Sequence, residues 1–194
     1  MITKLERRIE EKLVFPTSEK GKYLSKFFSE GFTYIFPSRE ITSIYYENIN
    51  FDIYRDSVEG VVPRKKIRVR EKFGSLYLEE KIKLRDGKYK TSKKINYLPN
   101  VIHDQSYGVV KKICKVTYNR AYLGNGKIRL TLDSDLKFEN LINRYVVNMN
   151  NNIILEYKIL NNFSMSENYI SSHKELNSFK FSKYEQAISK VTNV

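Results

Sequence analysis

The sequence contains very few cysteines, glycines and prolines. Its 194 residues include one cysteine, eight glycines and four prolines. A lone Cys114 excludes an intrachain disulfide and a zinc site built from cysteines. No low-complexity linker marks an internal boundary, so we expect residues 1–194 to form a single domain.

Long hydrophobic runs are also missing. No apolar stretch approaches the roughly 20 residues of a membrane-spanning helix. The opening MITKLERRIEEK lacks the apolar region of a secretory signal. We therefore expect a cytoplasmic protein with no membrane span of its own. Hydrophobic residues still make up 41% of the chain, which is a globular composition that argues against disorder.

What the sequence does have is positive charge. Lysine and arginine number 35 against 22 acidic residues, which gives a formal net charge of +13. Such an excess favours a polyanionic partner: nucleic acid, an anionic membrane surface or a phosphate-rich small molecule. Composition alone does not choose among these three classes.

The basic residues of the central segment alternate with a period of two. In a strand this period places every second side chain on the same face. The first run comprises Arg64, Lys66, Arg68, Arg70 and Lys72, and the next comprises Tyr77, Glu79, Lys81, Lys83 and Arg85. A solvated outer sheet face is one explanation. A closed barrel with the charges inside is the other, because its lumen could hold phosphates and its isolated carboxylates a divalent metal.

Hydrophobic periodicity and turn residues predict about eight strands, mostly antiparallel neighbours. Their ranges are 5–14, 42–49, 64–73, 76–85, 88–95, 110–122, 127–138 and 150–160. Gly74-Ser75, Asp86-Gly87 and Asn125-Gly126 are the expected hairpin turns. Residues 18–28, 166–178 and 181–191 are expected to be helical, with Ser18 as one N-cap and Ser182 and Glu185 as a capping box. Residues 50–60 are expected to be a short helix or a turn.

Several short motifs resemble one family, in order along nearly the whole chain. They are RIEEKLVF, ITSIYYENINFDIY, KIRVRE, YLEEKIK, KTSKKI, TYNRAYLGNGKIRLTLD, ILEYK and FSKY. The sequence resembles the polyphosphate polymerase (vacuolar transporter chaperone, VTC) domain of the triphosphate tunnel metalloenzyme (CYTH-like) superfamily. The resemblance implies an α+β fold: a closed eight-stranded antiparallel β-barrel, the triphosphate tunnel, with flanking helices that include a C-terminal helix.

The same resemblance implies an ATP-dependent polyphosphate polymerase. Such a phosphotransferase moves the terminal phosphate of ATP to a growing inorganic polyphosphate chain, with Mn²⁺ or Mg²⁺ as cofactor. The implied partners are ATP and polyphosphate or pyrophosphate, with no nucleic acid and with room for a separate membrane partner. A metal-dependent (tri)phosphatase of the same fold, a non-catalytic polyphosphate-binding module and a nucleic-acid-binding protein are the alternatives.

The resemblance also assigns roles to residues. The expected catalytic side chains are Lys12, Arg68, Arg70, Lys81, Lys93, Arg120 and Arg129, with Lys90 and Lys94 competing for the place of Lys93. The expected substrate-binding residues are Arg8, Tyr118, Lys158, Ser182 and Lys183. Glu156 is the first expected metal ligand, helped by Glu10 and Glu79. Arg8 stands where the hydrolase branch carries a glutamate, which favours the polymerase branch.

Overall fold

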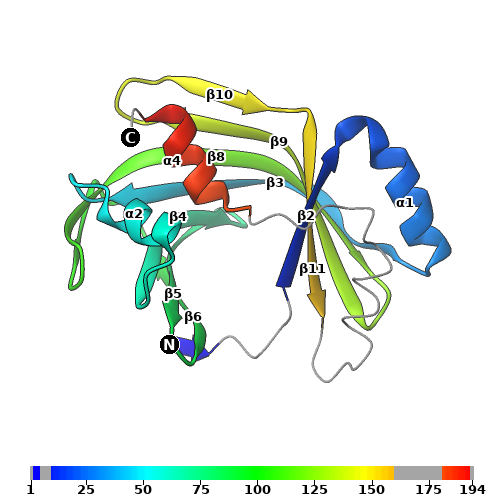
Figure 1. Ribbon diagram of the computed structural model, residues 1–194, viewed down its shortest axis with the longest axis horizontal. Helices are drawn as coiled ribbons and strands as arrows, with labels where there is room; N and C mark the ends of the chain where they lie inside the picture. Colours follow the sequence, from blue (N-terminus) through cyan, green and yellow to red (C-terminus); the bar gives the residue numbers. More distant parts are fainter. Residues whose placement is uncertain (1, 5–9, 160–180, 193–194) are drawn as a thin grey trace.

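The computed structural model describes residues 2–4, 10–159 and 181–192, and this part of the chain forms one curved antiparallel sheet with three α-helices (Figure 1). The strands are β1 (Ile2–Lys4), β2 (Glu10–Pro16), β3 (Thr33–Glu47), β4 (Arg64–Lys72), β5 (Ser75–Leu84), β6 (Gly87–Ile95), β7 (Val101–Asp104), β8 (Gly108–Gly124), β9 (Ile128–Asn140), β10 (Val146–Met149) and β11 (Asn152–Ile159). The helices are α1 (Lys20–Ser29), which follows a 3₁₀ turn at Thr17–Glu19, α2 (Asp52–Glu59) and α4 (Lys183–Val191).

The sheet is open, which corrects the expected closed barrel of eight strands. In the described residues it has eleven strands, in the order β1-β6-β5-β4-β3-β8-β9-β11-β2, with β10 beside β9 and β7 beside β8. The edge strands β1 and β2 are neighbours in the sequence, yet they pair with opposite ends of the sheet. The sheet therefore curves around a central space, and its two edge strands do not pair with each other. Register shifts in the β3–β8 and β8–β9 pairs accompany this curvature.

The strand predictions hold for the central hairpins, with small shifts at the turns. Lys72 pairs with Ser75, so the first turn is Phe73-Gly74. Both turn residues have positive φ, 50° and 70°, as a two-residue turn of type I′ requires. Leu84 pairs with Gly87, so the second turn is one residue earlier than predicted. The short strands β1, β7 and β10 were not predicted, and β3 begins at Thr33, well before the predicted start at residue 42.

The helix predictions hold in part. Ser18 is not an N-cap, because it lies inside the 3₁₀ turn and α1 begins at Lys20 without a side-chain cap. Ser182 does cap α4, since its hydroxyl accepts a hydrogen bond from the Glu185 amide. The helix expected at residues 166–178 lies outside the described part of the chain. No helix among the described residues is long and apolar enough to cross a membrane.

Alternation along β9 and β11 divides the sheet into an apolar face and a charged face. Leu130 and Leu132 are buried with α1, whose Phe27 ring meets Tyr157 of β11. The intervening side chains of β9 point to the other face, where Asp133 bonds Arg120 of β8. At one end of the charged face the apolar side of α4 packs against the sheet, through Tyr184, Ala187, Ile188 and Val191. The remainder of that face is left to the charged side chains.

Candidate functional site

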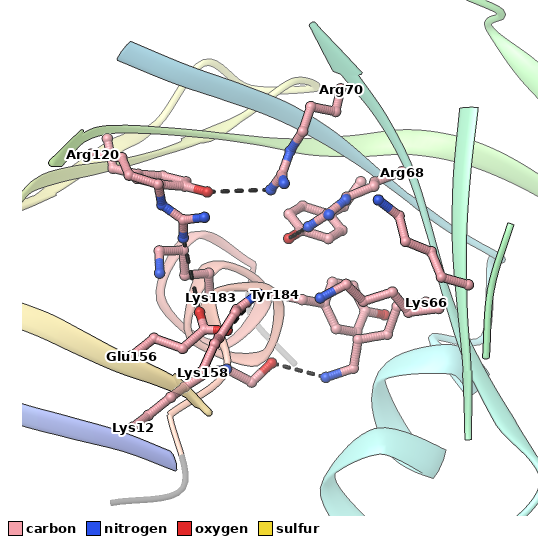
Figure 2. A pocket seen from close by; sticks show the side chains of 14 residues that line it. Lys12, Lys66, Arg68, Arg70, Arg120, Glu156, Lys158, Lys183 and Tyr184 are labelled. Atoms are coloured by element: carbon pink, nitrogen blue, oxygen red, sulfur yellow. Dashed lines mark hydrogen bonds and ion pairs between the residues drawn. The ribbon is translucent and has the colours of Figure 1, made fainter. Parts of the chain in front are cut away.

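A cavity of about 260 Å³ lies on the charged face of the sheet. Figure 2 shows its labelled side chains converging from β4, β8, β11, β2 and the start of α4. Nine of the lining residues are basic and one is a carboxylate. The basic ones are Lys12, Lys66, Arg68, Arg70, Lys81, Lys90, Arg120, Lys158 and Lys183; the others are Glu156, Tyr45, Tyr118, Ser182 and Tyr184.

β4 supplies two arginines that are held in different ways. The Arg68 guanidinium donates twice to one oxygen of Glu79, at 2.9 and 2.7 Å. Arg70 donates to the hydroxyls of Ser43 (3.0 Å) and Tyr118 (3.2 Å), and it forms no ion pair with a carboxylate of the described residues. Burial and the charge of Arg68 lower the pKa of Arg70. Arg70 is therefore a positive group with donors oriented at the cavity and its charge not neutralised.

Glu79 lies inside the wall formed by β4, β5 and β6. It is fully buried and accepts from Arg68, Lys72 and, at 2.7 Å, Lys90. Burial alone would raise the pKa of this carboxyl, but Arg68, Lys72 and Lys90 together lower it below its ordinary value. Its oxygens are occupied by three cations, so Glu79 holds the basic wall together and is not placed to bind a metal.

The opposite wall carries Glu156 on β11. This carboxylate is 8% exposed and lines the cavity, with Lys158 at 3.2 Å and Arg120 at 3.9 Å. Burial would raise its pKa, but Lys158, Lys12, Arg120 and Lys81 lower it below the ordinary range. Glu156 is thus ionised and turned toward the cavity. Lys12, its partner in register on β2, donates to the carbonyl of Phe181 at 2.9 Å.

Asp133 connects the sheet to the start of α4. Its two oxygens accept from Arg120 at 2.6 and 2.7 Å, and Lys183 reaches one of them at 2.5 Å. Burial would raise the pKa of this fully buried carboxyl, but Lys183 and Arg120 lower it. The triad fixes the guanidinium plane of Arg120 beside the Tyr118 ring, 5.2 Å from its centroid. Arg120 and Lys183 both line the cavity as well.

A second buried contact holds α4 in place. The Tyr184 hydroxyl donates to Glu47 at the end of β3, and Glu47 also accepts from the backbone amides of Ile53 and Tyr54 at the start of α2. Burial raises the pKa of Glu47 to about 7. From the same helix, Glu185 accepts from Lys66 at 2.9 Å and from Ser57 of α2. These bonds bring Ser182, Lys183 and Tyr184 to the cavity.

The model of the VTC domain family matches this chain over residues 2–112 and 100–192. The two matches together span almost the whole sequence. The chain belongs to the VTC domain family. A comparison with curated protein sequences finds no match.

Several solved structures share the fold of this VTC domain. A candidate adenylate cyclase from Bacillus halodurans superposes with a TM-score of 0.59 at 13% identity, covering 90% of this chain and 93% of that one. A candidate adenylyl cyclase from Hippeastrum with a dominant triphosphatase activity gives 0.57 at 14% identity, covering 95% and 97%. A protein from Pyrococcus horikoshii gives 0.55 at 15%, covering 94% and 96%. At these identities the likeness establishes the shared fold alone.

Most of the residues expected at the site of this VTC domain do meet at the cavity. Those brought together are Lys12, Arg68, Arg70, Lys81, Arg120, Tyr118, Lys158, Ser182, Lys183 and Glu156. Lys93 is a correction: it is exposed and pairs with Leu78, on the face opposite to Lys81. Lys90 pairs with Lys81 and lines the cavity in its place. Arg8 lies outside the described residues, and only the backbone of Glu10 is described.

Arg129 shares the charged face but lies beyond the cavity lining. It pairs with Lys158 across β9 and β11, one step past the pair of Thr131 and Glu156. The Arg129 Nε and the Thr131 hydroxyl are buried and have no hydrogen-bond partner among the residues that the structure describes.

Three lining residues were not expected at the site: Tyr45, Lys66 and Tyr184. Lys66 had a usable signal, because it alternates with Arg68 and Arg70 on one strand face. Tyr184 follows Ser182 and Lys183 in the FSKY motif, so the same motif contains it. Tyr45 is recognisable only once β3 is paired with β4, where it lies opposite Arg68.

The donor set fits a divalent metal only in a limited form. Among the described residues, no group of three or more histidine, cysteine or acidic side chains gathers as a ligand cage. Glu79 and Asp133 are held by cations, and Glu156 is the carboxylate that reaches the cavity. Mg²⁺ is commonly held by one or two carboxylates together with substrate phosphates. Glu156 with phosphate oxygens meets that description.

Proposed function

We propose that this VTC domain is an ATP-dependent polyphosphate polymerase, which transfers the terminal phosphate of ATP to the end of an inorganic polyphosphate chain. The observation that carries the proposal is the cavity wall, with nine basic side chains against the single carboxylate of Glu156. Phosphoryl transfer requires positioning and charge neutralisation more than covalent help from the protein. A tunnel-fold protein with this wall is suited to hold several phosphates in line.

The proposed roles follow from how each cation is held. Arg70 donates to two hydroxyls and pairs with no carboxylate of the described residues, and we assign it to the transferred phosphate, where negative charge must be stabilised in the transition state. Arg68 and Arg120 are fixed by Glu79 and Asp133 and so offer preorganised donors. The flexible ammonium groups of Lys12, Lys81, Lys90 and Lys158 neutralise charge along the chain. Bound Mg²⁺ or Mn²⁺ would supply further charge neutralisation at Glu156.

The lowered pKa of Glu156 makes it a poor general base for hydrolysis. A hydrolase gains from a general base whose pKa lies near the working pH. The pKa of Glu156 is lowered by Lys158, Lys12 and Arg120, so this carboxylate is a weak base. A polyphosphate end is already anionic and needs no base to become a nucleophile. The (tri)phosphatase of the same fold remains the second candidate, because the Hippeastrum protein with this fold has that activity.

Product analysis separates these two functions. The purified chain is incubated with ATP and Mn²⁺, and in parallel with Mg²⁺, and the products are resolved on urea gels with nucleotide analysis beside them. We expect a ladder of phosphate polymers formed together with ADP. The Arg70→Ala variant should lose at least about a hundredfold in turnover, since one charge-stabilising donor is commonly worth that much. Release of orthophosphate without polymer would assign the triphosphatase instead.

A further inference from the structure

A second basic cavity of about 230 Å³ adjoins the first. Lys12, Lys66 and Lys81 line both cavities, so the two are continuous along the β4–β5–β6 wall. The second cavity continues past them to Arg64, Lys83 and Lys88. No carboxylate of the described residues lines it; its other lining residues are Lys65, Ile82 and Tyr89.

Arg64, Lys83 and Lys88 form one cross-strand row. Arg64 of β4 is directly opposite Lys83 of β5, which is opposite Lys88 of β6. Like charges placed directly opposite one another destabilise a sheet. The neighbouring Lys65, on the other face of β4, shows the usual remedy, since it pairs with Asp104 at 2.7 Å.

In the described residues, no acidic side chain compensates the charges of this row. Arg64 donates to the backbone carbonyls of Gly60 and Val61, and no carboxylate pairs with any of the three cations. The next row inward, Lys66, Lys81 and Lys90, is also wholly basic. The two basic rows follow one another from the first cavity into the second. Together they could bind an anion that is longer than the first cavity.

We propose that Arg64, Lys83 and Lys88 form an outer subsite that binds a linear polyphosphate as it leaves the first cavity, so that chains longer than a triphosphate bind more tightly. This subsite adds a preference for long chains to the proposed function. It depends on the proposed function only in that the polymerase reaction would supply the polymer. Rows on one strand face repeat about every 6.7 Å, so the two rows add about that length to the path of bound phosphates.

Linear polyphosphate fits the second cavity better than single-stranded nucleic acid does. Proteins that bind single strands combine basic grooves with aromatic side chains on which the bases stack. The second cavity has one aromatic residue, Tyr89, and its hydroxyl is held by Asp86 at 2.5 Å. A chain made only of phosphates needs cations and no stacking surface.

The test compares two probes on the full chain by calorimetric titration: tripolyphosphate and a polyphosphate of about a hundred units. The test variant is Lys83→Gln with Lys88→Gln. The matched control is Lys111→Gln with Lys137→Gln, which removes the same charge from two exposed lysines outside both cavities. We expect the test variant to lose about tenfold in affinity for the long chain, as two charge-assisted contacts would give, and to bind tripolyphosphate as the unchanged protein does.

Equal losses for both probes, or the same loss in the control, would overturn the subsite. Displacement of the long chain by oligodeoxythymidine at equal phosphate concentration would overturn polyphosphate as its occupant. The binding measurement tests the subsite independently of the turnover assay. A length preference that vanishes in the test variant supports the subsite even if the protein makes no polymer, whereas polymer synthesis without any length preference contradicts it.

Discussion

The two walls of the cavity each bury a glutamate that is followed two residues later by a lysine, and they use it differently. In the β4–β5–β6 wall Glu79 is wholly buried and accepts from Arg68, Lys72 and Lys90. In the β9–β11–β2 wall Glu156 lines the cavity and has Lys158 as its near partner. The same short motif therefore serves once as a scaffold for cations and once as a group open to ligand. What decides the role is the number of cations that the neighbouring strands bring to it.

Replacement of Glu79 by glutamine should have the largest effect on folding. The change leaves Arg68, Lys72 and Lys90 close together with no compensating charge, and breaking a buried ion pair in this way costs about 3–5 kcal/mol. We expect the urea unfolding midpoint to fall accordingly. Glu80→Gln is the matched control, because Glu80 is the next residue on β5 and points to the other face.

A Glu79→Gln variant that unfolds like the unchanged protein would contradict the scaffold role. If that variant also lost its metal dependence selectively, Glu79 would have to be a ligand and the two walls would be alike.

Replacement of Glu156 by glutamine should reduce turnover. Glutamine keeps the size of the side chain but removes the charge that a divalent metal requires. We expect turnover with Mn²⁺ to fall at least about a hundredfold, while the affinity for long-chain polyphosphate changes by less than about threefold. Parallel measurements of turnover against metal concentration and of polyphosphate binding check both parts. Unchanged turnover with an unchanged metal dependence would show that Glu156 is only an ion-pair partner for Lys158.

The sequence could predict the basic face because strand alternation has a fixed period. Arg68 and Arg70 lie two apart in a run bounded by turn residues, so their common face follows from geometry alone. The same rule could have rejected Lys93. In an antiparallel pair the sum of partner numbers is constant, and whether the turn is placed at 85–86 or at 86–87, odd residues of β5 face even residues of β6. The even-numbered Lys90 therefore shares the face of Lys81, and Lys93 does not.

Other features depend on distant parts of the chain and carried no local signal. Closure could not be judged from eight strand patterns, since the open edge lies between β1 and β2, which are adjacent in sequence but pair at opposite ends of the sheet. The contrast between Glu79 and Glu156 is also non-local. It depends on Lys90 reaching across from β6 to Glu79, and a Glu-x-Lys pattern on one strand does not record that contact.

The smallest expected effect is a pH dependence that involves neither wall. Glu79 and Glu156 have pKa values lowered by their cations, so both stay ionised above pH 4.5. Glu47, which holds Tyr184 of α4 and the start of α2, has a pKa raised by burial from 4.5 to about 7. The folded state then binds a proton more tightly than the unfolded chain does. Its stabilising contribution is complete below pH 4.5 and is lost as the pH rises to about 7, by about 2–3 kcal/mol.

Urea unfolding at several pH values between 4.5 and 7.5 measures this slope, and Glu47→Gln is the variant to compare. Glutamine does not titrate, so its stability should lack the fall seen in the unchanged protein over that range. A slope that persists in Glu47→Gln would place the titrating group elsewhere. A slope that disappears would show that the anchor of α4 responds to pH while the carboxylates of both walls keep their charge, which separates the structural support of Ser182 and Lys183 from the electrostatics of the cavity they line.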